Sequence, residues 1–99
     1  MLDIVLTPDA EFDLNEIWVY IANESMNAAD RVLQGIHERF VALAGNEEMG
    51  EQIPKISRYR YRRFCYANYA IYYRSTEQKL IVLRVLHGAR DQDATLSLD

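Results

Sequence analysis

NYAIYYRSTEQKLIVLRVL, residues 68–86, contains two apolar runs that are separated by the polar segment STEQ. Both runs are short and rich in β-branched and aromatic residues, which is typical of strands, and the polar segment predicts a turn between them. Because side chains alternate along a strand, one face of each run is expected to be buried. The predicted buried residues are Tyr69, Ile71, Tyr73, Ile81, Leu83 and Val85. Tyr72, Arg74 and Arg84 are then expected on the opposite face.

A third strand is predicted immediately upstream, where residues 58–66 (RYRYRRFCY) alternate arginine and tyrosine. Both faces of this run carry aromatic residues, so the pattern leaves open which face is buried. The alternation also fits a platform that stacks bases and binds phosphates. A sheet face with solvated guanidinium groups over packed tyrosines is the simpler interpretation. Cys65 is expected to be a small core hydrophobe, and residues 47–57 (EEMGEQIPKIS) are expected to form a loop.

The first half of the chain predicts a short strand, LDIVL at residues 2–6, followed by two helices. Thr7 is the expected cap of the first helix and Pro8 suits its first position. The second helix is expected to begin at Asn27 as cap, with Asp30 three residues later, and to end at Gly45. The two predicted core stripes have helical spacing and consist of Ala10, Leu14, Ile17 and Ile21, and of Ala29, Val32, Leu33, Ile36, Phe40 and Leu43.

These elements predict a single α+β domain that spans residues 1–99. The order is β-α-α-β-β-β, with a largely antiparallel sheet and an αα-hairpin packed on one of its faces. Apolar residues make up 49% of the chain and charged residues 26%, as expected for a soluble globular protein. No signal-like segment is visible, and no apolar run approaches the roughly 20 residues that cross a bilayer. The cytoplasm is therefore the expected compartment.

The charge is divided unequally along the chain. Residues 1–54 hold 2 basic and 11 acidic residues, a net charge of −9, whereas residues 55–99 hold 9 basic and 4 acidic residues, a net charge of +5. Such an asymmetry can create a basic side that meets nucleic acid or an acidic protein. It also arises when acidic helices simply face a basic sheet. Both interpretations stay open at this point.

Four segments together resemble the ParE branch of the RelE/ParE toxin superfamily of bacterial toxin–antitoxin pairs. They are residues 6–22 (LTPDAEFDLNEIWVYIA), 49–50 (MG), 69–74 (YAIYYR) and 84–91 (RVLHGARD). None is a strict chemical motif, but they occur in the family order and extend over most of the chain. The resemblance implies a toxin that poisons DNA gyrase, is not itself a nuclease, and is neutralised by a ParD-like antitoxin in a hetero-oligomer.

The segment RVLHGARD supplies the candidate functional corner, which consists of Arg84, His87, Arg90 and Asp91. The resemblance implies that this corner, beside the carboxyl-terminal tail, faces gyrase. The alternatives are that His87 only hydrogen-bonds a nearby group and that Arg90 and Asp91 form a local ion pair of little energetic value. The tail, residues 92–99, is weakly apolar, so it is expected to dock weakly unless a partner orders it. The resemblance implies that the carboxyl end contacts gyrase, so deletion of the tail is expected to reduce toxicity more than thermal stability.

A RelE-like nuclease that cuts mRNA on the ribosome is the alternative function. It needs cations for the phosphate and a group that moves protons, and the candidates are Arg60, Arg62, Arg74, Arg84 and His87. The histidine-tyrosine or tyrosine of such nucleases is missing here, because Gly88 follows His87 and no tyrosine occurs after Tyr73. We therefore expect no catalytic residue and no sequence-specific binding of nucleic acid. Metal-ligand spacing and a Gly-rich phosphate loop are also missing, so no metal or cofactor is expected. A non-toxic module that only binds its antitoxin is a second alternative.

The first predicted helix also has apolar residues opposite its core stripe. Phe12 and Val19 fall almost opposite the stripe, with Trp18 and Tyr20 on the two flanks. These four residues are the predicted antitoxin-binding strip, on which an antitoxin helix would lay its apolar side. The alternative is that they are scattered surface residues without a role. The basic second half of the chain would suit an acidic antitoxin segment.

Overall fold

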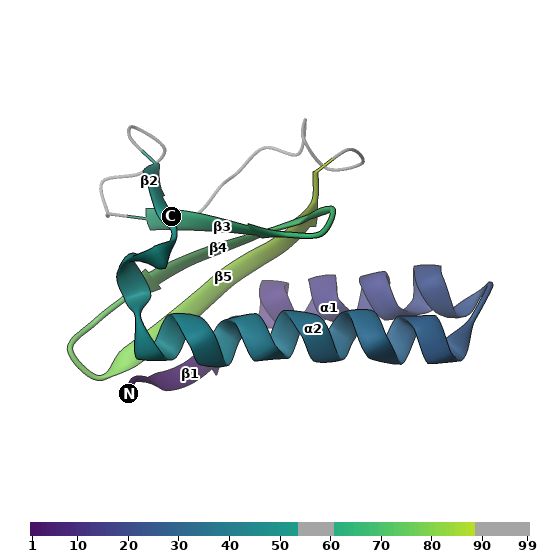
Figure 1. Ribbon diagram of the computed structural model, residues 1–99, viewed down its shortest axis with the longest axis horizontal. Helices are drawn as coiled ribbons and strands as arrows, with labels where there is room; N and C mark the ends of the chain where they lie inside the picture. The colour runs from purple at the N-terminus through teal and green to yellow at the C-terminus, as the bar shows by residue number, and fades with distance from the viewer. Residues whose placement is uncertain (54–60, 89–99) are drawn as a thin grey trace.

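The computed structural model describes residues 1–53 and 61–88. Its elements, in chain order, are β1 (Asp3–Leu6), α1 (Pro8–Ala22), α2 (Met26–Gly45), a 3-10 turn η1 (Glu47–Met49), β2 (Glu51–Ile53), β3 (Tyr61–Tyr66), β4 (Tyr69–Ser75) and β5 (Lys79–His87). The strands form one sheet in the order β1-β5-β4-β3-β2, in which only the β1–β5 pair is parallel. Figure 1 shows α1 and α2 side by side, forming one layer against the sheet. The predicted α+β fold with an αα-hairpin on the sheet is confirmed.

Helix α1 begins where the sequence predicts, because Thr7 and Pro8 provide its cap and its first residue. The Thr7 hydroxyl accepts a hydrogen bond of 3.1 Å from the backbone N–H of Ala10, which satisfies one of the free donors at the helix start. The predicted core stripe of this helix faces the sheet, and three of its four residues are fully buried: Ala10, Leu14 and Ile17.

Helix α2 begins two residues earlier than predicted. Ser25, rather than Asn27, is the cap: its backbone is extended, and its hydroxyl accepts from the N–H of Ala28 at 3.1 Å. The predicted cap was wrong because serine and asparagine are equally good capping residues, so composition alone did not choose between them. The core stripe of α2 is confirmed, because Ala29, Ile36, Phe40 and Leu43 are fully buried and the partly buried Val32 and Leu33 pack against the core.

Part of the predicted loop at residues 47–57 is regular structure. Residues Glu47–Met49 form η1, and Glu51–Ile53 form the edge strand β2, which pairs with β3 in the register Glu51↔Arg63. A strand of three residues is too short to show an alternating pattern, which is why the loop prediction failed there. The positions of Arg58, Arg60, Arg90 and Asp91 and of the tail at residues 92–99 lie outside the described residues.

A β-bulge in β5 changes which of its residues face the helices. Tyr72 lies opposite Arg84 while Tyr73 lies opposite Val82, so Leu83 is an extra residue between the two pairs. The core residues of β5 are therefore Leu80 and Val82 before the bulge and Val85 after it. The predicted burial of Ile81 and Leu83 against the helices was wrong, because a bulge shifts the alternation by one residue. Val85 and the three predicted residues of β4 are confirmed in this core: Tyr69, Ile71 and Tyr73.

The opposite face of the sheet carries a smaller apolar cluster that includes Tyr61, Tyr72 and Leu86, with Leu83 packed against it. Tyr72 therefore faces away from the helices, as predicted. Strand β3 contributes to both faces, since Tyr61 joins this second cluster and Phe64 packs against the main core. Cys65 is exposed, so its predicted place in the core was wrong. Cys65 lies near the end of β3, close to the turn that leads to β4. Its neighbours in sequence are apolar, but its own side chain lies at the surface.

Candidate functional site

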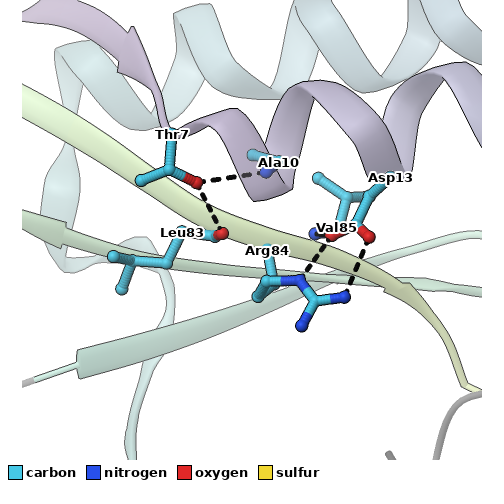
Figure 2. Close-up of polar contacts among 6 residues, drawn as sticks. All are labelled: Thr7, Ala10, Asp13, Leu83, Arg84 and Val85. Carbon is cyan, nitrogen blue, oxygen red and sulfur yellow. Dashed lines mark hydrogen bonds and ion pairs between the residues drawn. The ribbon is translucent and has the colours of Figure 1, made fainter. Parts of the chain in front are cut away.

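Asp13 and Arg84 form a partly buried ion pair that joins α1 to the bulge of β5 (Figure 2). The Arg84 guanidinium donates to both carboxylate oxygens of Asp13, from Nε at 2.7 Å and from Nη2 at 2.9 Å. The backbone N–H of Val85 donates to the same carboxylate at 3.0 Å. Asp13 is only 8% exposed, so these donors replace the water that a charged group needs.

Arg84 lies opposite Tyr72 and next to the helix-facing Val85, so its side chain starts on the predicted face of the sheet, away from the helices. Its guanidinium nevertheless reaches Asp13 on the first helix, a contact that the strand pattern did not predict. Thr7 adds a second link between α1 and β5. Its hydroxyl donates to the carbonyl of Leu83 at 2.8 Å and also caps α1 (Figure 2). Three consecutive residues of β5 are thus bound to the first two turns of α1. Arg84 has a structural partner and cannot be counted as a cation that awaits a ligand.

The remaining described residue of the predicted corner is His87, the last residue of β5. Its ring is half-buried and packs edge-to-face on Tyr69, with the centroids 5.3 Å apart. Directly after His87, the backbone N–H of Gly88 donates a hydrogen bond of 2.8 Å to the carbonyl of Asn68. Because Arg90 and Asp91 lie outside the described residues, the structure does not test whether the four residues form one corner.

The four residues of the predicted antitoxin-binding strip do not all lie on one exposed surface. Phe12, Val19 and Tyr20 lie at the surface of α1, with exposed fractions of 64%, 45% and 58%. Trp18 is half-buried, and its indole N–H donates to the Asp30 carboxylate of α2 at 2.9 Å. Trp18 therefore belongs to the contact between the two helices, whereas the other three residues form an exposed apolar surface that we call the α1 strip.

The arginines of β3 and β4 mostly bind groups of the same chain. Arg62 donates to the carbonyl of Gly50 at 2.7 Å. Arg63 forms an ion pair with Glu51 across β2 and β3, and this hydrogen bond raises the pKa of the Arg63 guanidinium. A depression of about 180 Å³ lies beside them and is lined by residues of both charges: Glu47, Glu48, Gln52, Tyr61, Arg62, Arg74 and Ser75. The two glutamates reduce the positive potential that a phosphate group would need.

Of the candidate groups for ribonuclease chemistry that the structure describes, Arg62 and Arg74 line the same depression, whereas His87 does not lie with them. His87 lies opposite Tyr69 at one end of the hairpin, and Arg74 is five residues farther along β4. At about 3.3 Å per residue, this separation is about 16 Å. Arg84 is bound to Asp13 on the helical side. General acid–base catalysis requires groups within hydrogen-bonding reach of one reacting centre, and this arrangement does not provide it among the residues described.

Tyr73 links β4 to the segment that follows α2 through two hydrogen bonds of its hydroxyl. Its hydroxyl accepts from the N–H of Gly50 at 2.9 Å and donates to the carbonyl of Glu47 at 2.7 Å. Burial of the ring raises the pKa of this phenol. A Cβ atom on Gly50 would lie 2.4 Å from the hydroxyl, so only glycine permits the approach.

Comparison with known proteins agrees with this architecture. Residues 4–92 match the model of a family described as the ParE toxin of type II toxin–antitoxin systems, parDE. The chain belongs to the ParE toxin family. A solved chromosomal ParDE toxin–antitoxin system from P. aeruginosa has a similar fold, with a TM-score of 0.70 and 20% sequence identity over 88% of this chain and 96% of that chain. No curated protein matches the chain.

The Asp13–Arg84 and Tyr73–Gly50 contacts bring together, in pairs, the segments that carry the resemblance to ParE toxins. Residues 6–22 meet residues 84–91 through Asp13 and Arg84, and the MG pair meets YAIYYR through Gly50 and Tyr73. Sequence reasoning missed Asp13 and Tyr73 as organising residues. The available signal for Asp13 was a carboxylate beside the core stripe of α1, together with one arginine inside the apolar run of β5. Residues 1–53 and 61–88 contain no group of three or more ligand side chains that could hold a metal ion, and no helix long and apolar enough to cross a membrane.

Proposed function

We propose that this ParE toxin poisons DNA gyrase in the cytoplasm and is neutralised by a ParD-like antitoxin that binds the α1 strip. Membership of the family supports a toxin with an antitoxin partner. The α1 strip is the observation that carries the antitoxin site, because Phe12 is a large aromatic residue that is 64% exposed on a helix whose other face is already buried. An exposed apolar surface of this kind suits an amphipathic helix.

The proposed target is gyrase rather than ribosome-bound mRNA. The separation of His87 from Arg74 along β4, and the binding of Arg84 to Asp13, support a toxin that acts by binding. The purified protein should inhibit DNA supercoiling by gyrase or cause cleaved DNA to accumulate, and it should not cut mRNA on ribosomes. Ribosome-dependent cleavage that is lost in His87→Ala would favour the nuclease alternative. No effect in either assay, with antitoxin binding intact, would favour a non-toxic antitoxin-binding module.

The antitoxin site is tested by truncating the α1 strip. Phe12→Ala and Val19→Ala should each weaken antitoxin binding by about 2 kcal/mol, as is usual for apolar anchors at such contacts. The melting temperature and the gyrase effect should change little, because both side chains lie at the surface. Affinity is measured by calorimetry or surface plasmon resonance.

Val41→Ala is the matched control, since Val41 is 50% exposed on α2, close to the 45% of Val19 on α1. It should leave the affinity for the antitoxin unchanged. Equal affinities for wild type, Phe12→Ala and Val19→Ala would exclude the α1 strip as the antitoxin site.

A further inference from the structure

The charged residues on the exposed side of α1 are all acidic. The helix contains no lysine or arginine, and its exposed charged residues are Asp9, Glu11 and Glu16. The remaining acid of the helix, Asp13, is buried against Arg84 and contributes nothing to the surface. A partner on this side of α1 therefore meets negative charge alone from the helix itself.

Two of these carboxylates lie on the same side of the helix as the α1 strip. At about 100° per residue, Glu16 is about 40° and Asp9 about 60° around the helix from Phe12. Tyr20 lies about 80° from Phe12 on the same side. Along the helix axis, Glu16 lies between Phe12 and Tyr20, so an antitoxin helix that covers both aromatic rings must pass over it. Asp9 lies about one turn before Phe12.

The basic residues of the described strands do not neutralise this surface. Arg63 pairs with Glu51 and Arg84 with Asp13. The Arg39 guanidinium of α2 lies over the ring of Tyr66, 4.3 Å from its centroid. In the part of the chain that the structure describes, no ion pair involves Asp9 or Glu16. Their charges are left to solvent or to a partner.

We propose that the partner segment that covers the α1 strip is a basic amphipathic helix. It carries apolar anchors for Phe12, Val19 and Tyr20, and lysine or arginine side chains at the positions that face Asp9 and Glu16. This inference rests on the proposed antitoxin site and adds its charge. The proposed partner helix is basic, whereas the basic second half of the chain suggests an acidic antitoxin segment. We favour the basic helix because the partner lies on α1, and the exposed charges of α1 are negative. An acidic helix on the same strip would place like charges together, which disfavours the complex.

The charge of the partner segment is tested with the cognate antitoxin and the variant Glu16→Lys. This change should raise the dissociation constant about tenfold, mainly through lost electrostatic complementarity. Glu16→Gln, which removes the charge without reversing it, should have a smaller effect and should flatten the salt dependence of binding. Both variants should keep the wild-type melting temperature, since Glu16 is exposed.

Glu77→Lys is the matched control, because Glu77 is an exposed carboxylate in the turn between β4 and β5, outside the helical layer. It should leave the affinity unchanged. If Glu16→Lys binds the antitoxin as tightly as wild type, or more tightly, the basic helix is excluded. If Phe12→Ala weakens binding while Glu16→Lys does not, the antitoxin site stands and only its charge is wrong. If neither variant weakens binding, the site itself is wrong.

Discussion

Asp13 and Arg84 are separated by 71 positions in the sequence, yet their side chains organise the junction between the first helix and the last described strand. The carboxylate has three donors: two from the guanidinium and one from the backbone of Val85. These bonds lie directly after the bulge at Leu83, where a strand has lost its regular pairing. The pair therefore stabilises an irregularity that decides which residues of β5 face the helices.

Asp13→Asn should lower the free energy of unfolding by about 3 kcal/mol, because removing one charge leaves the other without its buried partner. The loss is measured by urea unfolding. Glu51→Gln removes the corresponding carboxylate from the exposed pair with Arg63 and should cost less than about 1 kcal/mol. Equal losses in the two variants would show that Asp13 has no special part in the fold.

At the scale of elements, the helices approach the sheet closely at one glycine. Gly35 lies inside α2, and a Cβ atom built on it would be 2.0 Å from the hydroxyl of Tyr66 on β3. The same tyrosine ring holds the Arg39 guanidinium on its face. A glycine within a helix normally costs stability relative to alanine, so its presence here is explained by the room that Tyr66 needs.

Gly35→Ala should therefore destabilise the protein by about 1 kcal/mol, although alanine is the better helix former by a similar amount. The reason is that Tyr66 must leave its place over α2. In a Tyr66→Ala background the same change should be stabilising, since only the helix propensity remains. A double-mutant cycle of unfolding free energies measures this reversal of sign, and a stabilising effect of Gly35→Ala in the wild type would contradict it.

At the scale of the whole molecule, the sheet has an apolar cluster on each face, and Tyr73 connects the larger one to the segment after α2. Its ring is fully buried in the core that the helices cover. Its hydroxyl holds Gly50 and the carbonyl of Glu47 at the start of the path to β2. Because this phenol is buried, the free energy of unfolding should fall at alkaline pH.

Burial raises the pKa of Tyr73 above the ordinary value of 10.0. The unfolded chain therefore releases the phenolic proton at lower pH than the folded protein. The contribution to stability is complete below pH 10.0 and is lost as the pH rises through the folded-state pKa. Tyr73→Phe should cost about 1–3 kcal/mol at neutral pH, because the N–H of Gly50 loses its acceptor, and should weaken the alkaline dependence. Unfolding curves between neutral and alkaline pH measure both effects, and the exposed Tyr20→Phe is the control that should change neither.

The amino-acid sequence alone predicted the α+β class, the order of the main elements, the start of α1 and the family to which the chain belongs. It did so because helix caps, helical spacing and strand alternation are local patterns, which residues close in sequence produce together. The exposure of Phe12 and Val19 followed from the same periodicity. The facing of Leu83, the contact between Arg84 and Asp13, the strand β2 and the exposure of Cys65 became clear only from the folded chain. A bulge, a three-residue edge strand and the burial of a single side chain depend on pairing between distant segments, and no local pattern records that pairing.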